Sequence, residues 1–346
     1  MTRRLVSKKI QAFRVHARWR WKTMVGNLRR ERVRRQIEQA RGPLAFRFHS
    51  PNNGMFAHLT WCLHVAAWAE RCGRRYEVSC TSVNYGDPAG NLNWFAQLLE
   101  HRKPLEAETP PTHLLVREYE ELPFFTEDPL FTLESARELF RESFRVTPAL
   151  AERVRELKER LFADRLVIGL HYRGTDKQVE ADRVSYEMAL HSARRALTAA
   201  ETSTGLRPAL FLATDETAMV EFAPRFLHPF PVVSVDSVVR STSCRPIHLD
   251  RGSDRSQFAR EAMIDSLLLG ECDILIKTAS MLSGWSMVMS AKKPVMLLNP
   301  PRPGSMFFPD YLLVESACKL GQEGAMVAEM IRARTGRDVS QASFPV

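Results

Sequence analysis

The segment VIGLHYRGTDK, residues 167–177, decides the fold prediction, because an apolar run ends in it abruptly at a row of polar side chains. The run 166–170 predicts a buried strand, and Gly174 predicts a sharp turn just after it. In an open α/β sheet, ligands bind at the carboxyl ends of the strands. His171 and Arg173 share a face of an extended chain, and the guanidinium of Arg173 suits a phosphate. A strand end whose charges are merely solvated is the alternative interpretation.

The rest of the chain repeats an alternation of strands and helices. Downstream of residue 166, short apolar runs alternate with helical patterns, which predicts a parallel sheet wrapped by helices. Upstream, a turn cluster at 50–54 separates an apolar run from a helical pattern, which predicts part of a second such sheet. The expected strands are 44–48, 76–80, 113–119, 166–172, 208–214, 231–235, 272–278 and 294–298, and the expected helices are about 55–71, 133–144, 147–162, 186–201, 217–226, 257–269 and 281–291.

The positive charge of the chain is concentrated in its first 42 residues. These hold 14 Lys/Arg and two Glu, whereas the other 304 residues hold 35 Lys/Arg and 38 Asp/Glu. Apolar residues recur at spacings of three and four from Val6 to Leu28, which predicts an amphipathic helix. Four interpretations stay open: contact with an anionic lipid surface, docking on the protein's own body or a second subunit, an organelle transit peptide, and nucleic acid binding. Charge alone favours the last, so no nucleic acid partner is expected.

Cysteine usage and hydropathy bear on localisation. The six cysteines contain no Cys-x-x-Cys pair, so we expect reduced thiols rather than a zinc ribbon or a disulfide framework. No run approaches about 18 apolar residues, and the amino terminus lacks the apolar core of a signal peptide. The sequence therefore predicts a cytoplasmic protein, peripheral at the inner membrane surface if the arm binds lipid.

The segment HYRGTDK, residues 171–177, resembles the His-x-Arg-x-x-Asp-Lys motif of one group of fucosyltransferases. This group includes the bacterial nodulation enzyme and the α1,6- and protein O-fucosyltransferases. The resemblance covers roughly residues 44–300. It implies an α/β fold of the GT-B type, with two Rossmann-like domains facing a donor cleft, and a GDP-sugar donor. The donor-binding residues that this motif implies are Arg173, which would hold the diphosphate, and His171, Asp176 and Lys177.

Two further segments resemble motifs of the same group. The apolar run 209–213 ends in Thr-Asp-Glu, and its Asp215 matches the first aspartate of a family motif, while Glu216 replaces the second. A helix carrying Asp265, followed by a strand and a Thr-x-Ser step, resembles the third motif and implies that Asp265 reads the guanine and that Thr278 and Ser280 lie at the phosphate. For Asp215 and the Thr-x-Ser step, helix capping is the structural alternative.

The catalytic base and the amino-terminal contacts rest on weaker matches. The resemblance implies a glutamate as base, and Glu180 matches it with a one-residue gap; Asp182 is the other candidate, and either carboxylate could be solvated instead. Asn53, Gly54 and His58 resemble the group's glycine-rich turn and the histidine near the donor. Their alternatives are a glycine that serves the turn and a histidine that faces solvent.

Transfer from a nucleotide sugar requires that the leaving diphosphate be stabilised as its negative charge develops. One class of transferase uses a metal held by Asp-x-Asp, and this sequence contains no Asp-x-Asp. We therefore expect metal-independent transfer with no cofactor besides the donor, and with Arg173 and Lys177 meeting the charge.

The combined prediction is an inverting glycosyltransferase that moves fucose from GDP-fucose to a glycan or glycoconjugate hydroxyl. The expected parts are a basic amphipathic arm at 1–42, an acceptor-side α/β domain at 43–162 and a Rossmann-like GDP-sugar-binding domain at 163–346. A transferase using another nucleotide sugar, or a catalytically silent relative that binds nucleotide or glycan, are the alternatives.

Overall fold

The strands of the chain form two separate parallel sheets and one short antiparallel pair. The computed structural model describes residues 24–50, 53–87, 89–105, 109–125, 131–174, 181–236, 240–241, 254–300, 308–314 and 317–335. The parallel sheets confirm the α/β class predicted from the alternation of apolar runs.

The amino-terminal sheet has the strand order β2-β1-β4, and all its strands are parallel. Helix α2 connects β1 to β2 and is buried along most of its length because it carries few charged residues. The elements of this half are β1 (Leu44–His49), α2 (Met55–Arg71), β2 (Tyr76–Thr81), α3 (Phe95–Leu98), β3 (Leu99–His101), β4 (Thr112–Val116), η1 (Tyr119–Glu121), α4 (Leu133–Ser143), β5 (Phe144–Val146) and α5 (Pro148–Phe162).

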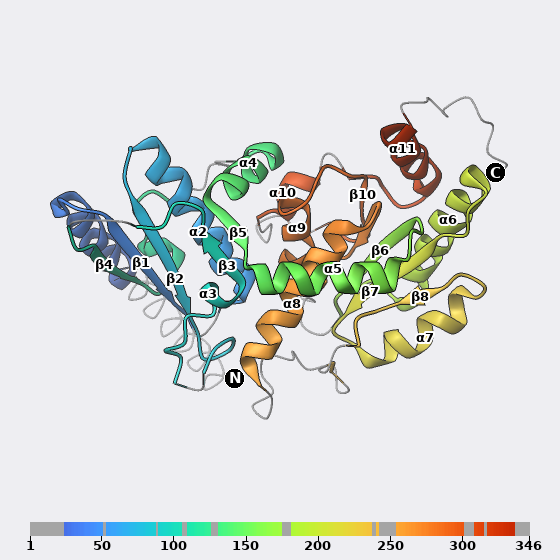
Figure 1. Cartoon of the computed structure of the whole chain (residues 1–346), viewed down its shortest axis with the longest axis horizontal. Helices are drawn as coiled ribbons and strands as arrows, with labels where there is room; N and C mark the ends of the chain where they lie inside the picture. The colour runs from blue at the N-terminus through green and yellow to red at the C-terminus, as the bar shows by residue number, and fades with distance from the viewer. Residues whose placement is uncertain are drawn as a thin grey trace, which may run out of the picture.

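The carboxyl-terminal sheet has the order β10-β9-β6-β7-β8 and is also parallel. Its elements are β6 (Val167–Tyr172), α6 (Tyr186–Thr204), β7 (Ala209–Thr214), α7 (Thr217–Leu227), β8 (Val232–Val233), α8 (Arg255–Glu271), β9 (Ile274–Lys277), α9 (Met281–Val288), β10 (Val295–Leu297), α10 (Asp310–Leu313) and α11 (Glu323–Thr335). In Figure 1 the two sheets lie toward opposite ends of an elongated molecule, with α9 and much of α8 between them.

Strands β6 and β7 are buried on both faces, as expected for a parallel sheet covered by helices. Their side chains alternate between two apolar clusters. Ile168 and Leu170 join the cluster formed with α6, α7 and α11, whereas Val167 joins the cluster that contains α5 and α8. Gly169 allows α8 to approach closely, because a Cβ there would lie 3.0 Å from Cys272 Sγ.

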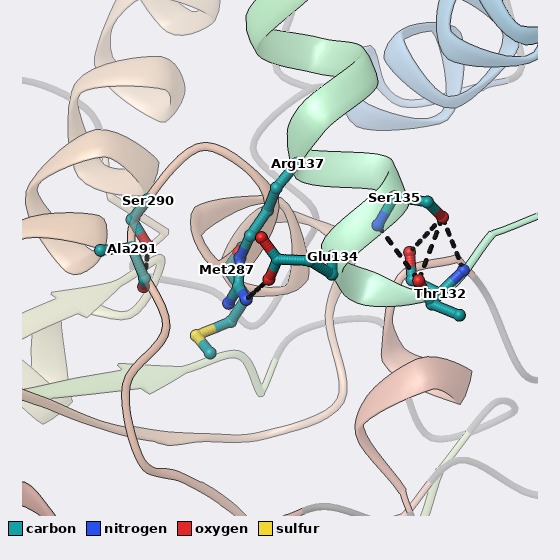
Figure 2. A network of polar contacts seen from close by, with 7 residues as sticks. All are labelled: Thr132, Glu134, Ser135, Arg137, Met287, Ser290 and Ala291. Carbon is teal, nitrogen blue, oxygen red and sulfur yellow. Dashed lines mark hydrogen bonds and ion pairs between the residues drawn. The ribbon is translucent and has the colours of Figure 1, made fainter. Parts of the chain in front are cut away.

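Helix α9 joins the two halves. The indole Nε1 of Trp285 donates to Thr60 Oγ1 of α2 (3.3 Å), and Arg137 Nε of α4 donates to the Met287 carbonyl (2.8 Å). Figure 2 shows Arg137 reaching from α4 toward Met287, with Glu134 at its other side. One apolar cluster therefore runs from the amino-terminal sheet to the carboxyl-terminal one.

The expected strands and helices are present, several of them with other bounds, whereas α3, β3, α10 and α11 were not expected. The expected strand 113–119 ends at Val116, and η1 follows. The residues from Phe144, expected as a helix end and a loop, form β5, which pairs with β3. Strand β8 has two residues. The pairing of β3 with β5 depends on contacts between distant residues, which a local pattern does not contain.

The described end of the basic arm is a helix over 24–39 that docks on the amino-terminal half. Val33 is buried, Arg29 pairs with the buried carboxylate of Glu121 (3.2 Å), and Arg30 Nη2 donates to the Pro123 carbonyl (3.0 Å). The described residues of the predicted apolar stripe, Met24 and Leu28, are exposed, so this docking is made by other residues than the stripe. Residues 1–23, which hold most of the expected amphipathic helix, lie outside the described residues. No described helix is long and apolar enough to cross a membrane.

Candidate nucleotide-binding edge

The carboxyl ends of β6, β7 and β9 lie side by side, because these strands are neighbours and parallel. His171 is in register with Lys277 of β9, and Tyr172 is in register with Thr214 of β7. This edge of the sheet brings together five of the predicted donor-binding residues: His171, Arg173, Asp215, Thr278 and Ser280. Asp176, Lys177 and Glu180 lie outside the described residues.

Two reciprocal hydrogen bonds join the segment of Arg173 to the segment of Thr278. The Arg173 backbone N–H donates to Thr278 Oγ1 (3.0 Å), and the Thr278 N–H donates to the His171 carbonyl (3.0 Å). The buried hydroxyl of Thr278 therefore fixes the backbone from which the Arg173 guanidinium projects. Two motifs more than 100 residues apart in the sequence are thus in direct contact.

His171 is almost fully buried at this edge. Burial lowers the pKa of its imidazole well below the usual range, and the positive charges of Lys277 and Arg173 lower it further. His171 is thus neutral at pH 7. Its Nδ1 is buried and has no hydrogen-bond partner among the described residues.

Gly174 is required by packing rather than by backbone conformation. Its φ is not in the positive range that favours glycine. A Cβ at this position would lie 2.9 Å from Tyr172 Cε1 and closer still to Glu216 Oε1. At Gly174 the backbone therefore passes directly over the buried carboxylate of Glu216.

The carboxylate of Glu216 is buried beneath that turn. Its Oε2 accepts a hydrogen bond from the Tyr186 hydroxyl, whereas its Oε1 has no partner within the described part of the chain. Tyr172 packs edge-on against Tyr186 and donates to the Val184 carbonyl (2.7 Å). Burial raises the pKa of the Tyr172 phenol to about 12, and the negative charge of Glu216 adds to this.

Asp215 lies directly after β7. The N-cap position of α7 belongs to Glu216, whose side chain makes no capping hydrogen bond. The Asp215 carbonyl accepts from the Ser241 N–H (2.7 Å), and the Ser241 carbonyl accepts from Thr217 N–H (3.3 Å). The N-cap is therefore one residue later than the capping alternative placed it, and the segment at 240–241 lies against this end of β7.

Asp265 lies on α8, the helix that packs on β6, β7 and α9. Burial raises the pKa of its carboxyl to about 7; the Arg240 guanidinium opposes the rise and Glu261, one turn earlier on α8, adds to it. Arg240 also donates to the Val235 carbonyl (2.8 Å). A carboxyl with this pKa gains from ligand N–H donors, because they favour its charged form.

The predicted residues of the amino-terminal half make contacts within that half. Asn53 Nδ2 donates to Ser50 Oγ (2.8 Å) and to Glu118 Oε2 (3.3 Å). Gly54 is the N-cap of α2 with φ −69°, a value open to any residue, so its expected role in a glycine-specific turn finds no support in its conformation.

His58 does not face solvent, which corrects the structural alternative considered for it. It is fully buried, its ring stacks on that of Trp94 (5.9 Å between centroids), and Trp61 lies 4.9 Å away. Burial lowers the pKa of His58 to about 3, and the charge of His49 contributes.

Sequence reasoning missed the polar partners that hold this edge. Lys277 and Asp310 form a buried ion pair (2.7 Å), Glu216 accepts from Tyr186, and Asn299 bonds to the Ala279 N–H (2.8 Å). A lysine that closes the otherwise apolar run Ile274–Lys277 was a visible signal, since lysine is almost never buried without a partner. No local pattern identified Asp310, 33 residues further along.

Within the described ranges, no group of three or more His, Cys, Asp or Glu side chains is arranged to hold a metal ion. The polar groups gathered at the edge are instead the Arg173 guanidinium, the Lys277–Asp310 ion pair, the carboxylates of Asp215 and Glu216, a neutral histidine and backbone N–H groups. Of these, the guanidinium and the N–H groups can stabilise an anionic ligand.

Fucosyltransferases are among the solved structures to which this chain is similar. They include a NodZ α-1,6-fucosyltransferase soaked with GDP-fucose (17% identity, 74% of this chain and 95% of that chain covered, TM-score 0.46). They also include Bradyrhizobium fucosyltransferase NodZ (15%, 75% and 95%, TM-score 0.48). An Arabidopsis thaliana FUT1 variant in complex with GDP is a further match (14%, 78% and 74%, TM-score 0.44).

No protein-family model and no curated protein matches the chain. The fucosyltransferase group that HYRGTDK resembles is represented among these solved structures. Identities of 14–17% and TM-scores of 0.44–0.48 nevertheless assign neither substrate nor residue roles to this chain.

Proposed function

We propose that this chain is an inverting, metal-independent transferase of the GT-B type that moves fucose from GDP-fucose to a glycan or glycoconjugate hydroxyl. The observation that carries the proposal is the hydrogen bond between Arg173 N and Thr278 Oγ1. It joins two segments that each resemble a different motif of the same fucosyltransferase group. In this proposal residues 43–162 form the acceptor-side domain and residues 163–346 form the donor-binding domain.

The proposed roles follow from the charges at the edge. Arg173 stabilises the β-phosphate as the bond to fucose breaks, since preorganised donors are most effective where charge develops. Lys177 and Asp176 assist it, and His171 donates or accepts a hydrogen bond as a neutral ring. Asp265 accepts from the guanine N–H groups, and this contact holds its carboxyl ionised despite the raised pKa.

The acceptor hydroxyl must also lose a proton, and Glu180 is the proposed base. Asp182 is the second candidate: its side chain is exposed, and its carbonyl accepts from Asn299 Nδ2 (2.7 Å). Substitution of each carboxylate by its amide separates them, because only loss of the base lowers kcat without weakening donor binding.

The deciding experiment incubates the purified full chain with a panel of GDP- and UDP-sugars and an acceptor glycan mixture, and measures the released nucleotide. We expect release of GDP from GDP-fucose and thermal stabilisation by GDP but not by UDP. Stabilisation by UDP alone would support another nucleotide sugar as donor. GDP binding without hydrolysis or transfer would support the silent relative.

Residues 1–23 are the part of the basic arm proposed to touch an anionic membrane surface. The expected result of deleting them is loss of sedimentation with vesicles that contain phosphatidylserine, with the melting temperature unchanged. The helix over 24–39 is kept, because Arg29 pairs with the buried carboxylate of Glu121. Vesicle binding that survives the deletion would sink this proposal.

A further inference from the structure

The turn between β9 and α9 is held at three successive backbone N–H groups, each by a different part of the chain. Such anchoring leaves the turn little freedom, so the groups that follow it are preorganised. The three hydrogen bonds run from Thr278 N to the His171 carbonyl (3.0 Å), from Ala279 N to Asn299 Oδ1 (2.8 Å) and from Ser280 N to Asp310 Oδ2 (2.8 Å).

The third anchor, Asp310, also forms an ion pair with Lys277. Lys277 Nζ donates to Asp310 Oδ1 (2.7 Å), and both side chains are buried. Helix α9 packs closely against the same carboxylate at Gly284, where a Cβ would lie only 2.6 Å from Asp310 Oδ1. Burial lowers the pKa of the Lys277 ammonium, and Asp310 opposes that shift.

A buried ion pair is a weak device for stability. Removing two charges from water is costly, and an apolar pair of similar volume is often as stable or more stable. The Lys277–Asp310 pair makes a hydrogen bond to the α9 N-terminus that an apolar pair could not make. One oxygen of Asp310 is neutralised by Lys277, while the other fixes the N-cap residue of α9.

The N-cap residue itself has an unused polar group. Ser280 Oγ is buried, makes no capping bond and has no partner among the described residues. The first N–H groups of a helix point outward along its axis and favour anions. A buried, unpartnered hydroxyl at the start of this helix therefore marks a place for a ligand oxygen.

We propose that Lys277 and Asp310 are positioning residues for the donor's diphosphate. Asp310 fixes Ser280 and the first turn of α9 so that Ser280 Oγ and the free N–H groups meet a phosphate oxygen. Lys277 cancels the negative charge of Asp310 that would otherwise repel the phosphate. This inference rests on the proposed function, since the diphosphate belongs to the GDP-sugar.

The test compares binding of GDP and of guanosine, which lacks phosphates, by calorimetry. In Lys277→Met/Asp310→Leu the ion pair is replaced by apolar side chains. We expect the Kd for GDP to rise by about tenfold or more, with the Kd for guanosine unchanged, because only the diphosphate site is disturbed. Ser280→Ala should raise the Kd for GDP in the wild-type background. The same substitution should raise it much less in Lys277→Met/Asp310→Leu, since the ion pair and Ser280 act through one contact to the phosphate.

A matched control lies on the other face of the sheet. There Arg195 of α6 pairs with the buried carboxylate of Glu323 of α11 (2.7 Å), and Arg195→Met/Glu323→Leu should leave both affinities at wild-type values. GDP affinity equal to wild type in folded Lys277→Met/Asp310→Leu overturns the inference, and so does an equal loss for GDP and guanosine. A wild-type chain that does not bind GDP overturns the proposed function instead.

Lys277→Met/Asp310→Asn covers the case in which the apolar pair does not fold. It keeps an oxygen for the Ser280 N–H, but a neutral amide oxygen accepts a weaker hydrogen bond than the carboxylate does, so Ser280 is held less firmly. We expect its GDP affinity to fall by about threefold or more at constant guanosine affinity. Unchanged GDP affinity in this variant also overturns the inference.

Discussion

The carboxyl edges of the two sheets differ in what their buried polar atoms contact. At the carboxyl-terminal sheet, several such atoms at adjoining strand ends have no partner among the described residues: His171 Nδ1, Glu216 Oε1 and Ser280 Oγ. At the amino-terminal sheet, Asn53 bonds to Ser50 and Glu118. The ring nitrogens of His58 and the indole Nε1 of Trp94 also lack described partners, but these two rings stack on each other and pack against Trp61 and Tyr85.

The difference indicates which edge is prepared for a polar ligand. A buried polar atom without a partner costs free energy that a ligand's hydrogen bonds or ordered water can recover. Two of these atoms, His171 Nδ1 and Ser280 Oγ, lie at adjoining strand ends near Arg173 and can bond to a polar ligand, whereas the Gly174 turn covers Glu216 Oε1. At the amino-terminal edge, the side chains of Asn53 and Ser50 already hydrogen-bond to each other.

The largest expected effect is that of Arg173→Ala. We expect kcat/KM for GDP-fucose to fall by about 10³-fold or more, because a preorganised cation at the leaving diphosphate is lost. The melting temperature should change little, because the backbone N–H of residue 173 still donates to Thr278 Oγ1 in this variant. The measurement is GDP release together with thermal unfolding, and turnover retained in this variant would end the assignment of the edge as the donor site.

Two glycine substitutions sharpen the same comparison. Gly174→Ala should lower the free energy of unfolding by about 3 kcal/mol, because its Cβ meets the buried carboxylate of Glu216. Gly54→Ala should cost under about 1 kcal/mol, since the nearest atom to its Cβ is Tyr85 Oη at 3.6 Å. Urea unfolding measures both.

A further variant identifies the cause of the larger loss. In a Glu216→Ala background the effect of Gly174→Ala should shrink, because the clashing carboxylate is gone. An equal cost in both backgrounds would mean that the turn, and not the packing against Glu216, needs the glycine.

The sequence predicted well what depends on local pattern. The runs that became β6, β7 and β9 showed apolar residues followed by polar ones, and those polar residues lie at the same edge. Once the strands are parallel neighbours, Arg173 and Thr278 must approach each other. The order of the strands, however, depends on packing between distant residues, and the sequence did not specify it.

The partners of the site residues were not predictable in the same way. Asp310 lies in a stretch without a strong pattern, and only the fold brings it to Lys277. His58 is a polar residue on a helix and could therefore face solvent, yet Trp94, from the loop after β2, covers it. A residue's neighbours across the fold determine its burial, and a local pattern does not contain them.

An effect smaller than those of Arg173→Ala and Gly174→Ala concerns the pH dependence of stability and the enclosure of His58. Burial lowers the pKa of His58 to about 3 in the folded protein, whereas an unfolded histidine titrates near 6.5. Between these values the unfolded chain binds more protons, so the free energy of unfolding falls as the pH falls below 6.5. From pH 7 to 5.5 the share of His58 is about 1 kcal/mol. Urea unfolding of His58→Phe at both pH values should show a loss smaller by this amount than in the wild type. An unchanged loss would mean that the His58 ring is reached by water in the folded chain, and that the two edges differ less than their contacts indicate.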